Sequence, residues 1–341
     1  MAFLLIENAR LLDRDTDIPR GALLIQDGTI AGFPTAEAAA ELKKDSAVTV
    51  FDAAGRTVMP SFIDMHAHFR DPGLTQKEDI ETGCRAAAAG GFGTVVLMPN
   101  TQPVVSSAEL AQINRTKARA YGTARFIQSV SITEGFDGAT VSHLEALDPA
   151  DVPLITEDGH EVTDSAIMFA AMQTAARKGL IVSCHCEDPF LAAAARPLRA
   201  QALALLSASG GAPTPEQQSE AAALLTKANT LLALAEDCAT LRNIRLAQEA
   251  GCHLHLCHVS TARCIEAVRA AKAAGLSVTC EVTPHHISLP HGNEAPALFH
   301  IVNPPLRSER DRRALIEALK DGTADVIATD HSAPAPVIGN I

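Results

Sequence analysis

Three features that would mark a membrane, secreted or nucleic-acid-binding protein are missing from this sequence. No apolar run approaches the roughly 18 residues of a transmembrane helix, and segment 1–7 has neither the basic region nor the apolar length of a signal peptide. Lysine and arginine number 28 against 40 acidic residues, and this net charge of −12 argues against nucleic acid and membrane partners. The eight cysteines are dispersed rather than spaced as a small disulfide framework, so we expect reduced thiols and a cytoplasmic protein.

The chain does contain a regular alternation of strand and helix signals after residue 58. Apolar runs, each followed by a helical stretch, lie at 60–68, 93–99, 124–131, 152–156, 180–185, 252–258, 276–283 and 325–329. These eight steps predict an α/β fold of the TIM-type (β/α)8 barrel class, with a doubly wound open sheet as the alternative. Three short strands and a helical turn precede them, so we expect an N-terminal β-rich subdomain at 1–58 and a barrel at 59–341.

The stretch 61–73 carries the first sign of chemistry. Its apolar start predicts a strand, and because alternate side chains share a face, His66, His68 and Arg70 should point the same way. Two imidazoles followed by a guanidinium suggest half of a metal site beside an anion-binding group. An isolated His-X-His pair is about as often two ordinary polar residues at a strand end, so the other strands must decide.

Residue types that bind metals recur where the other predicted strands end, and barrels of this class carry their active sites at that end. They are Asn100 after the second strand, Glu157 and Asp158 after the fourth, His185 on the fifth, His258 on the sixth, His285 and His286 on the seventh, and Asp330 and His331 on the eighth. A lone strand histidine is more often a hydrogen-bonded core residue than a ligand. Histidines at the ends of five predicted strands, the first and the fifth to the eighth, argue against coincidence.

Side-chain alternation narrows the set. On the fifth strand it places Cys184 and Cys186 opposite His185, so we interpret both cysteines as small buried residues and not as zinc thiolates. On the sixth strand it places His258 opposite His255, and we retain only His258 as a ligand candidate.

The resulting set of metal ligands is His66, His68, Asp158, His185, His258 and Asp330. Six ligands exceed the four of a structural zinc site, which implies a binuclear centre or one open metal with spare polar groups. In a binuclear centre, Asp158 would bridge the metals together with a hydroxide that is nucleophilic at neutral pH. Asp330 would act as the general base and acid that carries the proton to the leaving nitrogen. Glu157 is a weaker candidate for the bridge.

Together these motifs resemble the amidohydrolase superfamily, and within it the bacterial class I dihydroorotases. The resemblance spans about residues 1–331 and is carried by 64–73, 98–101, 157–159, 185–188, 258–261, 303–307 and 328–331. It implies a zinc enzyme, with two Zn²⁺ per chain, that reversibly interconverts L-dihydroorotate and N-carbamoyl-L-aspartate in pyrimidine biosynthesis. It also implies that Arg70 and Asn100 hold the substrate carboxylate and that Asn303 contacts the ring. Many relatives bridge their metals with a carboxylated lysine, but 151–164 contains no lysine, so Asp158 would take that role.

The sequence departs from this family after His331. The family continues with Ala-Pro-His, whose histidine binds substrate, and then with a last barrel helix and a closing β-rich segment. Here the chain reads SAPAPVIGNI, so we expect the final barrel helix and the C-terminal β segment to be missing. His285 or His286 could replace the substrate histidine, although a role at the rim of the site is the simpler interpretation. The hypothesis is a truncated dihydroorotase whose metal ligands survive and whose activity and stability are in question.

Two other functions stay open at this level. A hydantoinase or allantoinase would use the same metal centre, but a carboxylate clamp at Arg70 favours dihydroorotate over an uncharged hydantoin. A non-catalytic scaffold for aspartate carbamoyltransferase would be expected to have lost metal ligands, whereas this chain retains all six. We therefore expect a small-molecule substrate, and leave open a homodimer or a complex with aspartate carbamoyltransferase. The helical region 191–250, broken at 207–215, is assigned no chemistry.

Overall fold

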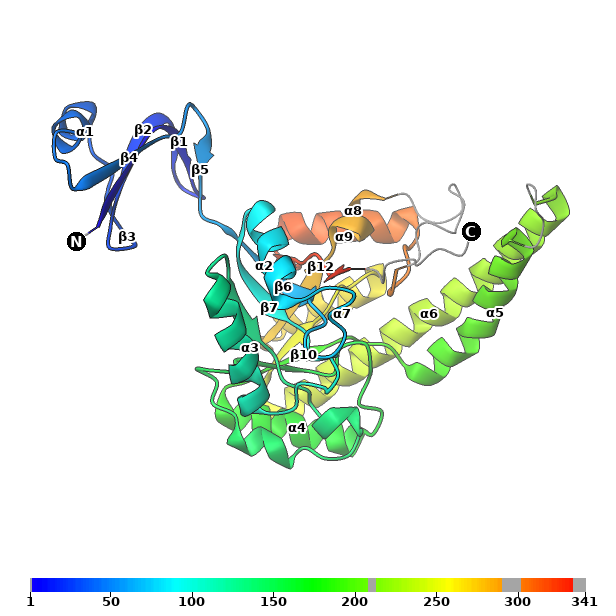
Figure 1. Ribbon diagram of the computed structural model, residues 1–341. Helices are drawn as coiled ribbons and strands as arrows, with labels where there is room; N and C mark the ends of the chain where they lie inside the picture. The colour runs from blue at the N-terminus through cyan, green and yellow to red at the C-terminus, as the bar shows by residue number, and fades with distance from the viewer. Residues whose placement is uncertain (1, 208–212, 290–301, 334–341) are drawn as a thin grey trace. The chain divides into compact units, whose positions relative to one another are not determined.

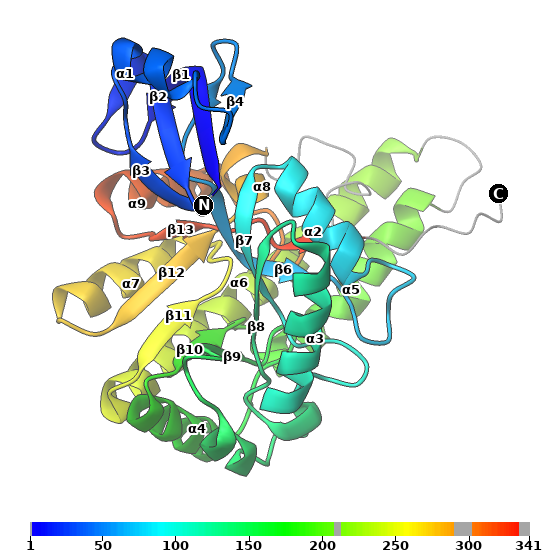
Figure 2. The ribbon, with the colours of Figure 1, turned by 60° about the vertical axis from the view of Figure 1, so that its left-hand side comes forward.

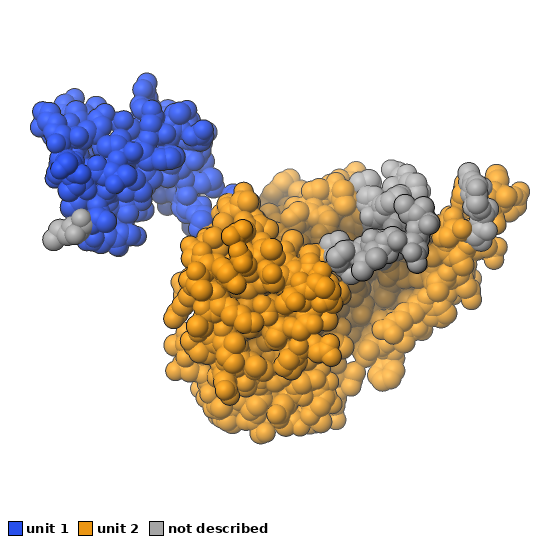
Figure 3. All heavy atoms as spheres, viewed as in Figure 1, with its two compact units in different colours: residues 1–62 blue, residues 63–341 orange. Residues whose placement is uncertain are grey.

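The computed structural model describes residues 2–207, 213–289 and 302–333. It divides the chain into two compact units, Met1–Phe62 and Ile63–Ile341 (Figure 1, Figure 3). Residues 334–341, on which the expected departure from the family largely falls, lie outside the described residues.

The first unit is a β-sheet with one helix, which confirms the predicted β-rich subdomain. Its strands are β1 (Phe3–Leu12), β2 (Asp17–Gln26), β3 (Thr29–Gly32), β4 (Val48–Asp52) and β5 (Thr57–Val58), and α1 (Ala36–Leu42) follows the N-cap Thr35. The order is β3-β2-β1-β4, with β5 also on β1. The Pro-containing start of β2 pairs with the end of β1 after two register shifts, so β2 extends back to Asp17.

The second unit is a closed (β/α)8 barrel, as predicted (Figure 2). Its strands are β6 (Phe62–His68), β7 (Phe92–Leu97), β8 (Arg125–Gln128), β9 (Leu154–Thr156), β10 (Ile181–Cys184), β11 (His253–Leu256), β12 (Val278–Val282), β13 (Val326–Ile327) and β14 (His331–Ser332). The hydrogen-bonded orders are β14-β6-β7-β8 and β9-β10-β11-β12-β13, and a parallel bridge from Val130 to Ile155 joins them. β13 and β14 form the two ends of the eighth strand. β13 pairs with β12 and β14 pairs with β6, so the ring of strands is closed.

Helices cover the outside of the barrel. They are α2 (Ile80–Ala89), α3 (Ala108–Tyr121), α4 (Ser165–Lys178), α5 (Pro189–Ser207), α6 (Pro215–Ala250), α7 (Ala262–Ala273), α8 (Pro284–Ser288) and α9 (Glu309–Asp321), with 3₁₀ turns at Glu134–Phe136 and Ser142–Ala146. The core lies between strands and helices, where Val182 and Leu254 pack with Met172 of α4 and Val268 of α7. α5 and α6 run side by side as a long hairpin (Figures 1 and 2). Among the described helices, none has the length and apolar character needed to cross a membrane.

Candidate active site

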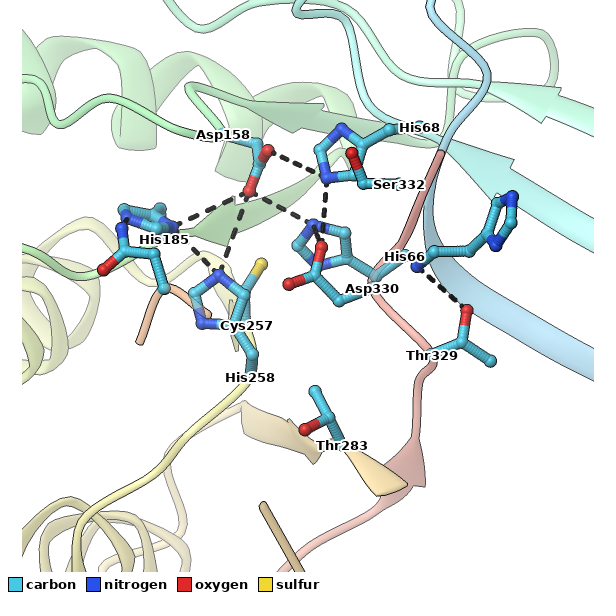
Figure 4. Close-up of polar contacts among 12 residues, drawn as sticks. His66, His68, Asp158, His185, Cys257, His258, Thr283, Thr329, Asp330 and Ser332 are labelled. Atoms are coloured by element: carbon cyan, nitrogen blue, oxygen red, sulfur yellow. Dashed lines mark hydrogen bonds and ion pairs between the residues drawn. The ribbon is translucent and has the colours of Figure 1, made fainter. Parts of the chain in front are cut away.

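The site is built where the barrel strands end. His66 and His68 are buried on β6, Asp158 and His185 follow β9 and β10, and His258 follows β11. Asp330 lies between β13 and β14, and it is held there because Asp64 of β6 accepts a hydrogen bond of 3.0 Å from the backbone N–H of Thr329. The six residues predicted as metal ligands therefore converge on one end of the barrel (Figure 4).

The carboxylate of Asp158 lies at the centre of this group. Its oxygens are 3.2 Å from Nε2 of His66, 3.5 Å from Nε2 of His68, 3.8 Å from Nδ1 of His185 and 4.0 Å from Nε2 of His258. The dashed lines in Figure 4 show these four contacts radiating from the same carboxylate. A carboxylate within reach of four imidazoles is the arrangement expected of a bridging metal ligand.

Asp330 joins the group from the other side. Its Oδ1 lies 3.1 Å from Nε2 of His68 and 3.5 Å from Nε2 of His66, and 19% of its side chain is exposed. Burial alone would raise the pKa of Asp330, but the hydrogen bond from His68 and the charge of His66 lower it to about 2. Asp330 is therefore an ionised carboxylate that is partly open to solvent.

The pKa values of the site histidines shift in opposite directions: although burial opposes it, Asp158 and Glu281 raise the pKa of His66 well above its usual value, whereas the pKa of His258 is lowered. Burial and the neighbouring His185 lower the pKa of His258 to about 4, so its imidazole is neutral at neutral pH, as a metal ligand must be. Although burial opposes ionisation of Asp158, His66 and His68 keep the pKa of that carboxyl well below its usual range. The site thus combines anionic carboxylates with imidazoles.

The donor set fits a metal. Ligand atoms of His66, His68 and Asp330 lie within 4.8 Å of one another, as do those of His66, Asp158 and His258. Nε2 of His66 is buried and, within the part of the chain that the structure describes, makes no hydrogen bond despite the two nearby carboxylates. Two overlapping three-residue groups of nitrogen and oxygen donors match the chemistry of a divalent transition metal.

The predicted substrate residues border these groups. Arg70 donates from Nη1 to Oδ1 of Asn100 at 3.1 Å and from Nη2 to Oγ of Ser332 at 2.7 Å. Asn100 in turn donates to Oδ2 of Asp158 at 3.0 Å. Nδ2 of Asn303 lies 3.3 Å from Nε2 of His185. Among the described residues, the buried Nε–H of Arg70 finds no acceptor.

Comparison with known proteins points in the same direction. A family model described as "Dihydro-orotase-like" matches residues 55–196. Dihydroorotases of Clostridium botulinum and Bacillus subtilis are 38% and 37% identical to this chain, each over 330 residues that cover 96% of it and 71% of the relative. The chain belongs to the dihydroorotase family.

Solved structures support the barrel fold of this family member. The L-hydantoinase (dihydropyrimidinase) from Arthrobacter aurescens matches with a TM-score of 0.76 at 22% identity, covering 98% of this chain and 70% of that one. The D-hydantoinase from Thermus sp. matches with a TM-score of 0.72 at 24% identity, covering 97% and 69%. The dihydroorotase-family chain therefore shares its fold with these hydantoinases.

His258 does reach the site, but the alternation of side chains along the sixth strand does not explain how it gets there. Leu254 and Leu256 face the helix layer, and His255, not His258, points into the barrel, where its Nε2 lies 3.1 Å from Glu281. β11 ends at Leu256, and His258 has a positive φ of 31°. His258 reaches the site because the backbone leaves the strand geometry, which a strand pattern cannot show.

Other residues considered from sequence have separate partners. Cys184 and Cys186 are buried in the apolar core. Oε2 of Glu157 accepts the backbone N–H of Thr133 at 2.9 Å and belongs to neither candidate metal group that contains Asp158 or Asp330. His286 is buried, with its ring nitrogens 2.7 Å from Oγ1 of Thr283 and 3.0 Å from the carbonyl of Pro304.

The sequence interpretation missed Glu281 of β12. This carboxylate is fully buried, and its Oε1 lies 2.7 Å from Nδ1 of His66. A charged residue inside an apolar run, Val278–Val282, was the available signal, because a buried carboxylate requires compensating partners.

Proposed function

We propose that this dihydroorotase-family chain catalyses the reversible conversion of L-dihydroorotate to N-carbamoyl-L-aspartate, as a cytoplasmic zinc enzyme. The observation that carries the proposal is the carboxylate of Asp158 within 4.0 Å of four histidines. A free guanidinium donor of Arg70 beside this cluster supplies the means of holding an anionic substrate. The described cysteines are all free thiols, in keeping with a reducing compartment.

Six residues would hold two metal ions. We assign His66, His68 and Asp330 to one ion, and His185 and His258, which lie 3.8 and 4.0 Å from Asp158, to the other, with Asp158 available to both; His66 is also grouped with Asp158 and His258. Zn²⁺ in such a site lowers the pKa of a coordinated water toward about 7 and polarises a carbonyl oxygen. Zn²⁺ is the proposed metal because imidazole and carboxylate are its common catalytic ligands.

Asp330 is the proposed catalytic acid and base. Its low pKa makes it a carboxylate at neutral pH, and its exposed edge can take the proton that the attacking water gives up. The protonated Asp330 then delivers this proton to the ring nitrogen as the amide bond breaks. In the reverse direction, the same group removes the proton from the attacking nitrogen of the carbamoyl group.

Arg70, Asn100 and Asn303 orient the substrate. The free Nε–H of Arg70, together with a neighbouring Nη–H, can make two parallel hydrogen bonds to the carboxylate of dihydroorotate. Asn100 joins Arg70 to Asp158 and so sets the distance between the clamp and the metal ligands. Asn303, next to His185, is placed to contact the ring.

The first test is metal content of the purified chain together with turnover of dihydroorotate and hydantoin. We expect about two zinc ions per chain and a preference for dihydroorotate. Arg70→Gln should lower kcat/KM for dihydroorotate by roughly 10- to 100-fold, because it removes a charge-assisted clamp. Hydantoin, which lacks the carboxylate, is the internal control and should be little affected. A preference for hydantoin would reassign the substrate, and turnover by a metal-free chain would contradict the metal centre.

A further inference from the structure

Glu281 is a buried carboxylate that the proposed reaction does not use. It points into the barrel from β12, with 0% of the residue exposed. Its Oε1 lies 2.7 Å from Nδ1 of His66 and accepts the backbone N–H of His258 at 3.0 Å, and its Oε2 lies 3.1 Å from Nε2 of His255. One carboxylate therefore joins β6 and β11 through three contacts.

The surroundings fix which atoms donate to this carboxylate. Oε1 of Glu281 accepts the backbone N–H of His258 at 3.0 Å, so this oxygen is an acceptor. The same Oε1 lies 2.7 Å from Nδ1 of His66, and an acceptor oxygen at this distance requires the proton of the contact to be on Nδ1. Nδ1 of His255 lies 2.9 Å from Oγ1 of Thr279, which holds that ring in place from the next strand.

This arrangement has a direct consequence for His66. With a proton on Nδ1, His66 has Nε2 available as its ligand atom, and Nε2 lies 3.2 Å from Asp158 and 3.5 Å from Asp330. The other tautomer would put the proton where a metal must bind. Glu281 also holds the backbone of His258 at the positive φ that turns this residue toward the site.

We propose that Glu281 is a positioning residue for the metal centre, which fixes the tautomer of His66 and the backbone of His258 and thereby sets metal affinity. The inference rests on the metal centre of the proposed function. It goes beyond that function because Glu281 is not one of the six proposed ligands, although with His66 and Cys257 it forms a third group of possible ligand atoms within 4.8 Å of one another. Such outer partners of histidine ligands typically change metal affinity by roughly 10- to 100-fold.

Two variants and a matched control test this role. Glu281→Gln keeps an oxygen that can accept from Nδ1 of His66, whereas Glu281→Leu removes every acceptor. The control is Glu236→Gln, because Glu236 of α6 is also a buried carboxylate that accepts a backbone N–H, that of Ser260 at 2.7 Å, and contacts no predicted metal ligand side chain. Zn²⁺ affinity is measured by competition with a chromophoric chelator, and ligand geometry by the visible absorption of the Co²⁺-loaded chain.

We expect Zn²⁺ affinity to fall by about 10-fold in Glu281→Gln and about 100-fold in Glu281→Leu. The Co²⁺ spectrum should change in both, and both readouts should stay near wild type in Glu236→Gln. If Glu281→Leu does not fold, the nearly isosteric Glu281→Gln carries the test. Wild-type affinity and spectrum in folded Glu281→Gln, or an equal loss in Glu236→Gln, would overturn the positioning role alone. A wild-type chain that binds no Zn²⁺ would instead overturn the proposed function.

Discussion

At the scale of single residues, His286 makes stability depend on pH. Burial lowers the pKa of this imidazole to about 3, and the charges of His285 and His258 act in the same direction. The unfolded chain, with a histidine pKa near 6.5, therefore binds a proton below pH 6.5 that the folded chain does not. Stability is fully present above pH 6.5 and falls as the pH falls toward 3, by about 2 kcal/mol at pH 5.

Denaturant unfolding at pH 7 and pH 5 measures this dependence. His286→Gln should show a smaller loss between the two pH values than wild type, by about the same 2 kcal/mol. His160→Gln is the matched control, because His160 is exposed and its replacement should leave the difference unchanged. An identical pH dependence in wild type and His286→Gln would show that His286 is not held neutral in the fold.

Much of the candidate site could be predicted at this scale, because strand ends meet at one end of a parallel barrel. That rule brought His66, Asp158 and Asp330 together without any knowledge of distances. It could not find Glu281, since a carboxylate in mid-strand is recognisable only once its partners from β6 and β11 are in place. Nor could alternation orient His258, whose backbone has left the strand.

At the scale of elements, the contact between α2 and β6 depends on Gly83. A Cβ at this position would lie 2.5 Å from the ring of Phe69, the residue after His68, and that ring is buried. In an exposed helix, replacing glycine by alanine stabilises by up to about 1 kcal/mol. Here we expect Gly83→Ala to destabilise by roughly 1–3 kcal/mol, because the helix must move away from the strand.

A double-mutant cycle with Phe69→Leu separates the two effects. The smaller side chain should relieve the clash, so that Gly83→Ala costs less in the Phe69→Leu background than in wild type. Denaturant unfolding of the four proteins gives the coupling free energy. Additive effects of the two substitutions would place the cost elsewhere in α2.

The barrel strands were largely predictable from the sequence, and the exception is the eighth strand. The eight apolar runs all became barrel strands, because strands buried on both faces give short continuous hydrophobic segments. The eighth run was expected as one strand at 325–329, but only β13 lies within it, and β14 follows after Asp330. Asp330 has a positive φ of 53°, a local backbone feature that composition does not encode.

At the scale of the whole molecule, the candidate metal ligands come from strands all around the barrel. Two of the six residues lie on β6, three follow β9, β10 and β11, and Asp330 lies between β13 and β14. The first unit, Met1–Phe62, contributes none of them. A bound metal should therefore stabilise the barrel against unfolding and leave the first unit unaffected.

Removal of the metal by a chelator tests whether it stabilises the barrel and not the first unit. Binding only to the folded state stabilises by about 2.7 kcal/mol when free metal is 100 times its dissociation constant, so the barrel transition in calorimetry should move to lower temperature. Hydrogen exchange should become faster in β6, β9, β10 and β11, because the metal no longer links the ligands on or after these strands. The backbone amides of β1 and β2 should keep their protection. Restoring Zn²⁺ is the control and should recover the slow exchange. Equal acceleration in β1 and β2 would mean that the two units unfold together, and unchanged exchange in the barrel strands would mean that the ligands do not share a metal.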